Sequence, residues 1–151
     1  MPGRKTPGPE RCDVLPSLTF LDLAQAPHSD RGQLDLREDV IEVTFTNNEF
    51  WMTLPVAPFE AARVNEIWVS LKGTVGDLCS VYWDGEGQEF SEQCCCHYPF
   101  KPALHWQILR FRVATHPSWR GAIKGLRLYP FHGHRPAMAG TGSIRWVRLV
   151  Q

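Results

Sequence analysis

The stretch Glu66-Ile-Trp-Val-Ser-Leu-Lys72 decides the fold, because apolar and polar residues alternate along it. In an extended chain Ile67, Val69 and Leu71 share one face, and the polar residues and one tryptophan share the other. The stretch 40–46 (VIEVTFT) alternates in the same way. A period of two residues is typical of a β-strand that buries one face. Both stretches therefore indicate strands of a sheet with one buried side.

Similar short runs recur along the whole chain and are separated by turn-forming residues. The Asp-Gly pair at 84–85 lies between two such runs and favours a β-hairpin there. About nine short strands with this spacing are typical of a β-sandwich or barrel. We expect strands over residues 14–23, 40–46, 50–54, 66–72, 79–83, 88–96, 105–113, 124–129 and 142–150.

Two segments depart from regular alternation. In the last strand Ile144 and Trp146 share one face, whereas Val147 and Leu149 share the opposite one. A β-bulge near Trp146 would reconcile the two halves of that strand. The best helical stretch is 58–64, which would make about two turns at most.

The length of 151 residues suits one domain with a well-buried core, and a hydrophobic share of 43% favours a globular chain. We expect a single β-sandwich domain over residues 13–151. The first residues, MPGRKTPGPERC, have no apolar stretch of the signal-peptide kind. We interpret residues 1–12 as a flexible lead-in or linker.

The charges argue against two classes of partner. Sixteen basic and sixteen acidic side chains cancel, and no polybasic run occurs. A nucleic-acid binder needs a basic surface, and a membrane-surface protein needs a basic cluster. No apolar run approaches the roughly 18 residues needed to span a bilayer. We therefore expect neither a nucleic acid nor a membrane as partner.

The chain has an odd number of cysteines, Cys12, Cys79, Cys94, Cys95 and Cys96. A secreted disulfide scaffold would usually show an even, spaced set. We expect reduced thiols, which together with the lack of a signal peptide favour the cytoplasm. A disulfide between Cys79 and one of the three consecutive cysteines stays open as an alternative.

Three segments of the second half resemble the galactose-binding-like jelly-roll domains, which include carbohydrate-binding modules. They are 81–83 (VYW) with 89–92 (EFSE), 119–130 (WRGAIKGLRLYP) and 142–149 (GSIRWVRL). The resemblance implies an all-β, two-sheet antiparallel sandwich, a jelly roll of about nine strands. It also implies a glycan or saccharide ligand, bound in loops at one end or across a concave sheet. Such domains often accompany sugar-modifying enzymes, so a neighbouring enzyme domain is a possible partner.

The same family often carries a structural calcium near the first and last strands. Asp22 could supply one carboxylate for such an ion, but the last strand contains no acidic residue. The sequence does not complete that site, and we expect no cofactor.

Sugar binding needs flat aromatic faces and planar polar groups for paired hydroxyls. Trp68 alternates with polar residues and would face outward, as would Tyr82 beside Ser80. Trp106 shares a face with Arg110 and Arg112, and together with Trp68 and Tyr82 it could form one concave face of aromatic and basic groups. If Arg127 lies on the same face as Arg110 and Arg112, the clustered guanidinium groups would favour an acidic sugar. Our candidate ligand-binding residues are Trp68, Tyr82, Trp106, Arg110, Arg112 and Arg127.

These candidates have plainer explanations. A loop or the second sheet could cover Trp68, and the aromatic and basic residues could form an ordinary amphipathic surface. The arginines could pair across strands with Glu42, Glu66 or Glu92. Trp51 lies opposite its apolar neighbours and raises the same question.

Two runs invite a metal site, but we predict none. Consecutive strand residues point to opposite faces, so Cys94 and Cys96 cannot act with Cys95 on one ion. No C-x-x-C pair is present to complete a structural zinc site. The His132-Gly-His134 pair, with His116 or His28 as a third ligand, is a weak signal.

We expect a non-catalytic carbohydrate-binding or glycan-recognising accessory domain. The first alternative is a structural sandwich that docks a neighbouring domain, and the second is a small jelly-roll enzyme acting on a glycan. The sequence has no G-x-S-x-G, H-E-x-x-H or P-loop motif. Two carboxyl groups in one groove would favour the enzyme.

Overall fold

The structure is a computed structural model that describes residues 17–85, 90–132 and 138–151. Its described strands are β1 (Gly32–Arg37), β2 (Val40–Phe45), β3 (Met52–Leu54), β4 (Phe59–Glu60), β5 (Glu66–Gly73), β6 (Leu78–Gly85), β7 (Cys95–Pro99), β8 (Ala103–Phe111), β9 (Ala122–His132) and β10 (Gly140–Val150). A short helix, α1 (Phe20–Leu23), and two 3-10 turns, η1 (Ala61–Arg63) and η2 (Val113–Thr115), complete the elements. The lead-in expected over residues 1–12 lies outside the described residues.

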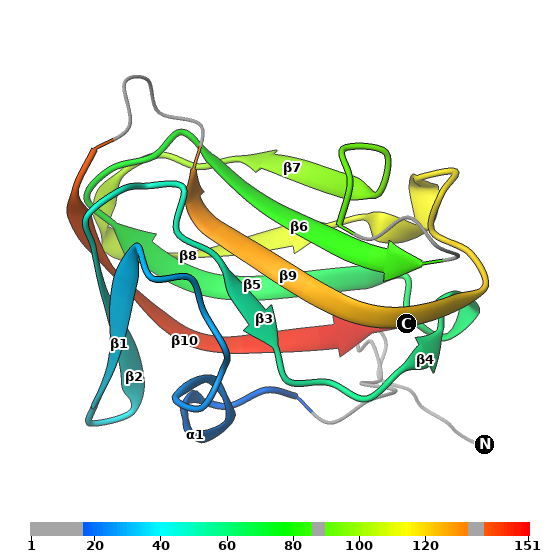
Figure 1. Ribbon diagram of the computed structural model, residues 1–151, viewed down its shortest axis with the longest axis horizontal. Coiled ribbons are helices and arrows are strands. Elements are labelled where there is room, and N and C mark those ends of the chain that lie inside the picture. Colours follow the sequence, from blue (N-terminus) through cyan, green and yellow to red (C-terminus); the bar gives the residue numbers. More distant parts are fainter. Residues whose placement is uncertain (1–16, 86–89, 133–137) are drawn as a thin grey trace, which may run out of the picture.

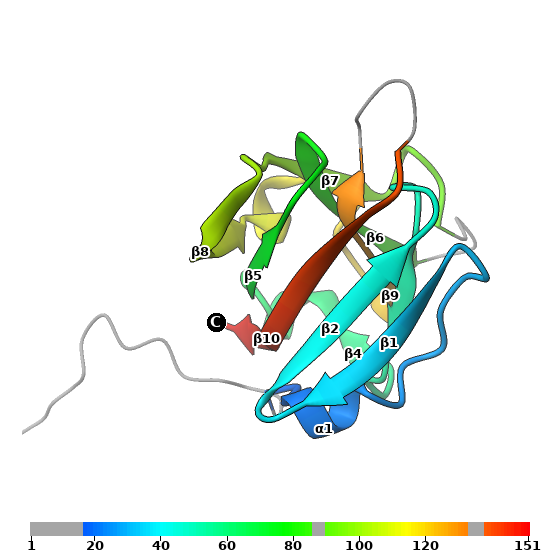
Figure 2. The same ribbon diagram turned by 90° about the vertical axis from the view of Figure 1, so that its left-hand side faces the viewer.

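The strands form two antiparallel sheets that pack face to face (Figures 1 and 2). We call them sheet A, with the order β1-β2-β10-β5-β8, and sheet B, with the order β3-β9-β6-β7 and β4 also paired to β9. In Figure 1, β6 and β9 of sheet B lie in front of β5 and β8 of sheet A. The predicted all-β, two-sheet antiparallel sandwich is confirmed, with ten described strands where about nine were expected.

The core lies between the sheets and is built from the inward residues of the alternating runs. Ile67, Val69 and Leu71 are fully buried, as their spacing predicts. Trp83 is also fully buried and contacts the ring of Trp119 edge to face. Gly121 has a φ of 67°, in the left-handed region that glycine adopts without strain.

The ring of Phe131 on β9 of sheet B packs directly against Gly142 on β10 of sheet A. A Cβ atom at position 142 would overlap that ring, and one at Gly73 would lie 2.7 Å from it. Phe131 also stacks on Phe45, with the ring centroids 5.4 Å apart. Glycine is therefore required at 142 because a side chain would separate the sheets.

The first predicted strand, 14–23, is wrong within its described part. Thr19 caps α1: its side chain accepts a hydrogen bond from the amide of Leu21, and Asp22 accepts one from the amide of Thr19. This local capping box competes with strand pairing, and only Leu18 makes a bridge, to Val147 on β10. The carboxylate of Asp22 that the calcium hypothesis needed therefore caps a helix.

Other boundaries also moved. The helical stretch 58–64 is the strand β4 followed by the single turn η1. β1 was missed because it is an edge strand with mostly exposed residues, so its alternation is weak. β7 begins at Cys95 rather than at residue 88, since residues 90–94 turn the chain and Phe90 has a φ of 44°. The predicted bulge is confirmed, because the register between β10 and β5 shifts between Ile144 and Trp146.

Candidate functional site

The outer side of sheet A carries three tryptophans and four basic residues. We call this set the tryptophan face: Trp68, Trp106, Trp146, Arg110, Arg145, Arg148 and Lys72. Three adjacent strands, β10, β5 and β8, bring these residues together. The three indoles are half-buried, so each keeps part of its surface in solvent.

One row of the face is centred on Trp68. Its neighbours in register are Arg110 on β8 and Arg148 on β10. The two guanidinium carbons lie 4.3 and 5.1 Å from the centroid of the indole. The indole N–H donates to Glu66 Oε1 at 2.8 Å, which fixes the orientation of the ring. At such distances each cation–π contact contributes about 0.5–1 kcal/mol near a surface.

A second row is centred on Trp106. The guanidinium of Arg145 lies 4.1 Å and the amine of Lys72 lies 4.9 Å from its ring centroid. Arg145 also donates two hydrogen bonds to Ser70 Oγ, at 3.1 and 3.0 Å. The bulge after Ile144 lets Arg145 reach Ser70 on the outer side of the sheet. Long basic side chains are thereby held in place instead of moving freely in solvent.

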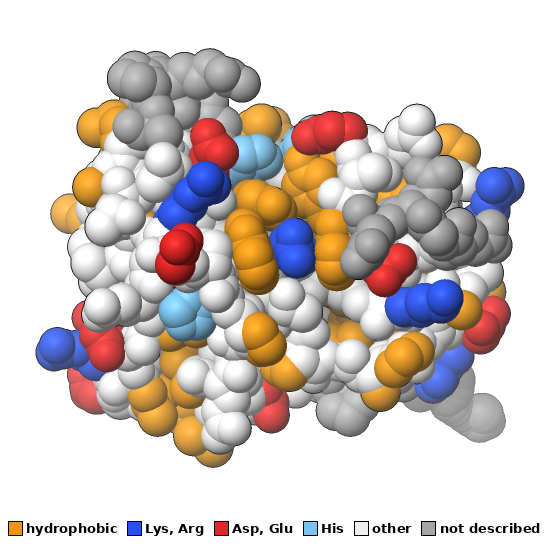
Figure 3. Space-filling view, in the orientation of Figure 1, with side chains coloured by type: hydrophobic (Ala, Val, Ile, Leu, Met, Phe, Trp, Pro, Cys, Tyr) orange, Lys and Arg blue, Asp and Glu red, His pale blue; other side chains and the backbone are white. Residues whose placement is uncertain are grey.

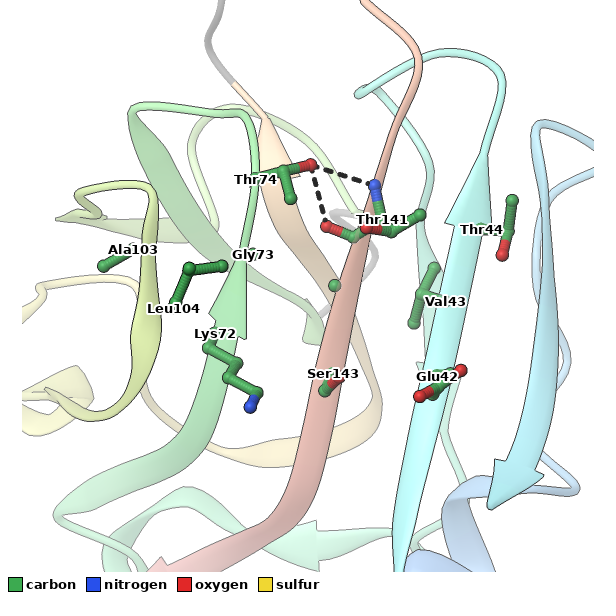
Figure 4. Close-up of a pocket in the computed structure, with 11 residues that line it drawn as sticks. Glu42, Val43, Thr44, Lys72, Gly73, Thr74, Ala103, Leu104, Thr141 and Ser143 are labelled. Carbon is green, nitrogen blue, oxygen red and sulfur yellow. Dashed lines mark hydrogen bonds between the residues drawn. The ribbon is translucent and has the colours of Figure 1, made fainter.

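The face continues into a shallow pocket of about 210 Å³ (Figure 4). Lys72 on β5 and Glu42 on β2 lie on either side of Ser143 on β10, as the strand register requires. Thr74 closes the upper end through a hydrogen bond from its hydroxyl to the carbonyl oxygen of Thr141, at 3.1 Å. The lining therefore offers one cation, one carboxylate and several hydroxyls beside the tryptophans.

The outer side of sheet B is a second polar and aromatic surface, which Figure 3 shows from the front. Hydrophobic side chains gather over its middle around a basic one. Arg127 lies between the rings of Trp51 and Phe90, with its guanidinium carbon 3.8 and 4.3 Å from their centroids. The guanidinium therefore packs between two rings, and among the described residues its buried Nε atom has no hydrogen-bond partner.

Beside Arg127 lies a hydrogen-bonded cluster around β7. Tyr82 donates its hydroxyl proton to Glu92 Oε1 at 2.7 Å. This hydrogen bond lowers the pKa of Glu92, while burial raises the pKa of Tyr82. Cys95 Sγ lies 3.5 Å from Glu92 Oε2 and 3.5 Å from His97 Nε2. Burial and the hydrogen bond with Glu92 raise the pKa of the Cys95 thiol to about 12.

Two histidines meet at one serine behind this cluster. Ser80 Oγ lies 2.6 Å from His97 Nδ1 and 3.0 Å from His132 Nδ1. Burial lowers the pKa of His132, so its neutral form is favoured there. We call Glu92, Cys95, His97, Ser80, Tyr82 and His132 the β7 cluster. The other histidine of the His132-Gly-His134 run, His134, lies outside the described residues.

The structure divides the six candidate residues between the two sheets. Trp68, Trp106 and Arg110 lie together on sheet A. Arg112 is exposed just beyond β8, where it lines a hollow with Glu66 and Arg110. The idea that the three arginines share a face is wrong for Arg127, because Arg127 belongs to β9 of sheet B.

Tyr82 is likewise separated from the tryptophans, since β6 belongs to sheet B. Its strand partners are Cys95 and Arg127, and its hydroxyl is taken by Glu92. The predicted joint face of Trp68, Tyr82 and Trp106 is therefore wrong.

The acidic residues suggested as arginine partners make other contacts, and Glu66 accepts the hydrogen bond from Trp68. Glu42 pairs with Arg37 at 3.3 Å, and Glu92 belongs to the β7 cluster. Trp51, which raised the same question as the candidates, packs on Arg127.

Sequence reasoning missed Trp146, Arg145, Arg148 and Lys72 as members of the site. A signal for them was present in the bulge at the last strand. Once the bulge places Ile144, Val147 and Leu149 inward, Trp146 and Arg148 must face outward. The partners of these residues on β5 and β8 could not be derived, because strand order is not encoded locally.

The described cysteines form no disulfide with one another. Cys79, Cys94, Cys95 and Cys96 are all free thiols, so the alternative of a disulfide with Cys79 is wrong. Cys95 and Cys96 face opposite sides of β7, as predicted: Cys95 faces the β7 cluster and Cys96 packs on the core.

Among the described residues, no helix is long and apolar enough to span a bilayer.

Comparison with known structures identifies the fold. A low-affinity xylan-binding module of family 86 from Roseburia intestinalis aligns with a TM-score of 0.56 at 15% identity, covering 91% of this chain and 96% of that one. A mutant of a carbohydrate-binding module of family 29 aligns with a TM-score of 0.61 at 7% identity, covering 91% and 92%. The C-terminal family 6 module of a marine laminarinase from Zobellia galactanivorans has a TM-score of 0.54 at 15% identity, covering 89% and 98%.

The chain has the jelly-roll fold of carbohydrate-binding modules. No protein-family model and no curated protein matches it. The resemblance inferred from the sequence is confirmed at the level of the fold. At these identities the likeness concerns the path of the chain and not the ligand.

Proposed function

We propose that this domain is a non-catalytic carbohydrate-binding accessory module whose glycan ligand lies across the tryptophan face. The observation that carries the proposal is the alignment of three half-buried indoles with four basic groups on one sheet, beside a polar pocket. The solved structures with this fold include one described as a low-affinity xylan-binding module, which supports a saccharide ligand.

The face supplies both kinds of contact that a saccharide needs. The solvent-exposed parts of Trp68, Trp106 and Trp146 offer apolar surface for the C–H patches of a sugar ring. Arg110, which is exposed, offers N–H donors whose fork suits adjacent hydroxyls or a carboxylate. The pocket at the end of the row adds further donors and acceptors for hydroxyl groups.

The basic groups outnumber the acidic ones on this face, and that favours an acidic glycan. Three arginines and one lysine surround the tryptophans, against the carboxylates of Glu42 and Glu66. Guanidinium groups bind carboxylates and phosphates more tightly than they bind neutral hydroxyls. A glycan with uronate or similar acidic groups therefore fits the charges better than a neutral one.

One observation favours a docking role as the second candidate. Leu104 and Ile108, on the outer side of β8, have exposed fractions of 86% and 47%. Exposed apolar side chains beside aromatic residues are also what a protein partner uses. A neighbouring enzyme domain would be the natural partner of such a surface.

An enzymatic role has less support in the pocket. Glycosidases use two carboxyl groups that flank the scissile bond. Among the residues that line this pocket, Glu42 is the one carboxylate. We therefore propose recognition rather than hydrolysis.

A glycan-array screen of the purified chain, with and without calcium and chelator, tests the proposal. We expect binding to a coherent set of saccharides, and we expect the variant Trp106→Ala/Arg110→Ala to lose it while remaining folded. The matched control is Trp51→Ala, which removes an arginine-stacked tryptophan from sheet B.

Each outcome of that screen has a meaning. A blank array with folded protein would overturn the proposal and favour the docking role. Wild-type affinity in the double variant would show that the ligand lies elsewhere. Loss of binding with chelator that added calcium restores would reveal a structural calcium that the sequence does not complete.

A further inference from the structure

Three different metal-ligating side chains converge on the outer side of sheet B. Cys95 and His97 lie two residues apart on β7, so both point to the same side of the strand. Glu92 reaches the same point from the preceding turn. Their ligand atoms, Sγ, Nε2 and Oε2, all lie within 4.8 Å of one another.

The distances between these atoms match the edges of a tetrahedral site. Zinc binds cysteine sulfur at about 2.3 Å, histidine nitrogen at about 2.0–2.1 Å and carboxylate oxygen at about 2.0–2.2 Å. Tetrahedral angles then place the sulfur about 3.6 Å from each of the other two atoms, and the nitrogen about 3.4 Å from the oxygen. The chain has 3.5 Å for both sulfur distances and 3.7 Å for the nitrogen–oxygen distance.

Each of the two polar ligands is also held by a second residue through its other atom. Tyr82 donates to Oε1 of Glu92, which leaves Oε2 facing Cys95. Ser80 contacts Nδ1 of His97, which leaves Nε2 facing the same point. Outer partners of this kind orient the ligands of metal sites.

The hydrogen bonds around Ser80 are consistent with a ligating tautomer of His97. A hydroxyl donates one proton and accepts others. Both contacts of Ser80 are satisfied when His97 donates its Nδ1 proton to Oγ and Oγ donates to Nδ1 of His132. In that arrangement Nε2 of His97 carries the lone pair that an ion requires.

We propose that Glu92, Cys95 and His97 bind a divalent transition-metal ion of the zinc class, with one coordination position left open. Calcium and magnesium prefer oxygen ligands, whereas a thiolate together with an imidazole suits zinc. When the ion binds, the Cys95 thiol releases its proton to solvent, and the resulting thiolate and the Glu92 carboxylate supply two negative charges that balance the ion. Glu92 and His97 are exposed, so the ion reaches the site from solvent.

The site rests on sheet B and the proposed glycan face on sheet A, and the two come together at the β7–β8 edge, where His97 and Arg110 line one hollow. No metal site was predicted from the sequence, and that prediction was based on the three consecutive cysteines and on the His132/His134 pair only. The spacing that matters is Glu92-x-x-Cys95-x-His97, in which the turn before β7 carries the third ligand. Three protein ligands and an open fourth position are typical of zinc sites that accept a water or another small ligand.

Titration of the full chain with Co²⁺ and with Zn²⁺ tests the proposal, in a buffer with a reductant that contains no thiol. We expect one equivalent of Co²⁺ to bind with a thiolate-to-cobalt charge-transfer band and with the visible bands of a tetrahedral ion. Zn²⁺ should displace it, and Ca²⁺ should not.

Two variants and one control connect the signal to these residues. Cys95→Ser should abolish the charge-transfer band and weaken Zn²⁺ binding by more than about 100-fold, since even loss of an outer partner costs about 10–100-fold. Glu92→Gln should weaken binding by a similar factor, and because Glu92 is 76% exposed the fold should be kept. The matched control Cys96→Ser, whose thiol packs on the core side of the same strand, should bind like the wild type.

Three results would overturn the site. They are no binding of either ion by the wild-type chain, a charge-transfer band that survives Cys95→Ser, and a band that Cys96→Ser removes. If Cys95→Ser does not fold, unchanged affinity in Glu92→Gln overturns it instead.

Discussion

The two outer faces of this sandwich use the same kinds of residue in different ways. On the tryptophan face, guanidinium groups lie over indoles that remain half-exposed, and a pocket continues the row. On sheet B, Arg127 lies between two rings and the neighbouring polar groups bond to one another. An aromatic–arginine pair alone therefore does not indicate a binding surface, because its free surface and free donors decide whether a ligand can use it.

The largest expected effect is on the free energy of unfolding, at the contact between Phe131 of sheet B and Gly142 of sheet A. Gly142→Ala would push a methyl group into the ring of Phe131 and should destabilise the fold by about 3 kcal/mol, the upper end of typical overpacking costs. Chemical denaturation measures this free energy of unfolding. In the control, Gly125→Ala, the nearest contact of the new methyl is 3.4 Å, so we expect little change. Equal stability of the two variants would contradict the close approach of the sheets.

The next largest effect is on glycan affinity, and it should distinguish the tryptophan face from the metal site on sheet B. Trp106→Ala/Arg110→Ala should lower glycan affinity by about 30-fold or more, because an aromatic contact and a hydrogen bond to a charged group together contribute about 2 kcal/mol or more. Calorimetry with a glycan found in the array measures the loss. The same variant should bind Co²⁺ like the wild type, and a weakened metal signal would show that the two faces are coupled.

A smaller effect should appear at the outer partner of the β7 cluster. Ser80→Ala removes the hydroxyl that orients His97 and should weaken Zn²⁺ binding by about tenfold. Competition with a chromophoric chelator measures the affinity. Ser29→Ala, which removes a part-buried hydroxyl remote from β7, is the control. Tighter Zn²⁺ binding in Ser80→Ala would mean that Ser80 does not position the histidine.

The smallest expected effect tests the charge of the tryptophan face. An acidic glycan should bind about threefold more tightly than its neutral counterpart at low salt, since a partly exposed ion pair contributes roughly 0.2–1 kcal/mol. The difference should shrink as salt is raised, because salt screens exposed charges. Affinities for a matched pair of oligosaccharides at two salt concentrations measure it. A preference for the neutral glycan would exclude the acidic ligand.

The sequence predicted the inner sides of the strands better than the outer ones. Burial of Ile67, Val69, Leu71 and Trp83 follows from alternation, which is a local property. The prediction of a first strand over residues 14–23 was wrong because a second local signal was overlooked. The capping box of Thr19 and Asp22 is also local, but its signal competes with alternation and it prevails over part of that segment.

For the candidate site, the sequence predicted that Trp68 and Arg110 face away from the core, with cover of Trp68 by a loop or the second sheet as the alternative, and that Cys95 and Cys96 face opposite sides. It did not establish which outward residues meet. Alternation relates a side chain to its own strand only, whereas β10 lies between β2 and β5 because distant segments pack together.

The sequence by itself therefore determined an all-β sandwich and the side of each strand that is buried. Only the tertiary structure placed Arg145 and Arg148 beside Trp68 and Trp106, moved Tyr82 and Arg127 to the other sheet, and brought Glu92 to Cys95 and His97. The physical reason is that burial follows from hydrophobic spacing along one strand. Convergence of side chains depends on strand order and on turns, which are set by contacts between residues far apart in the chain.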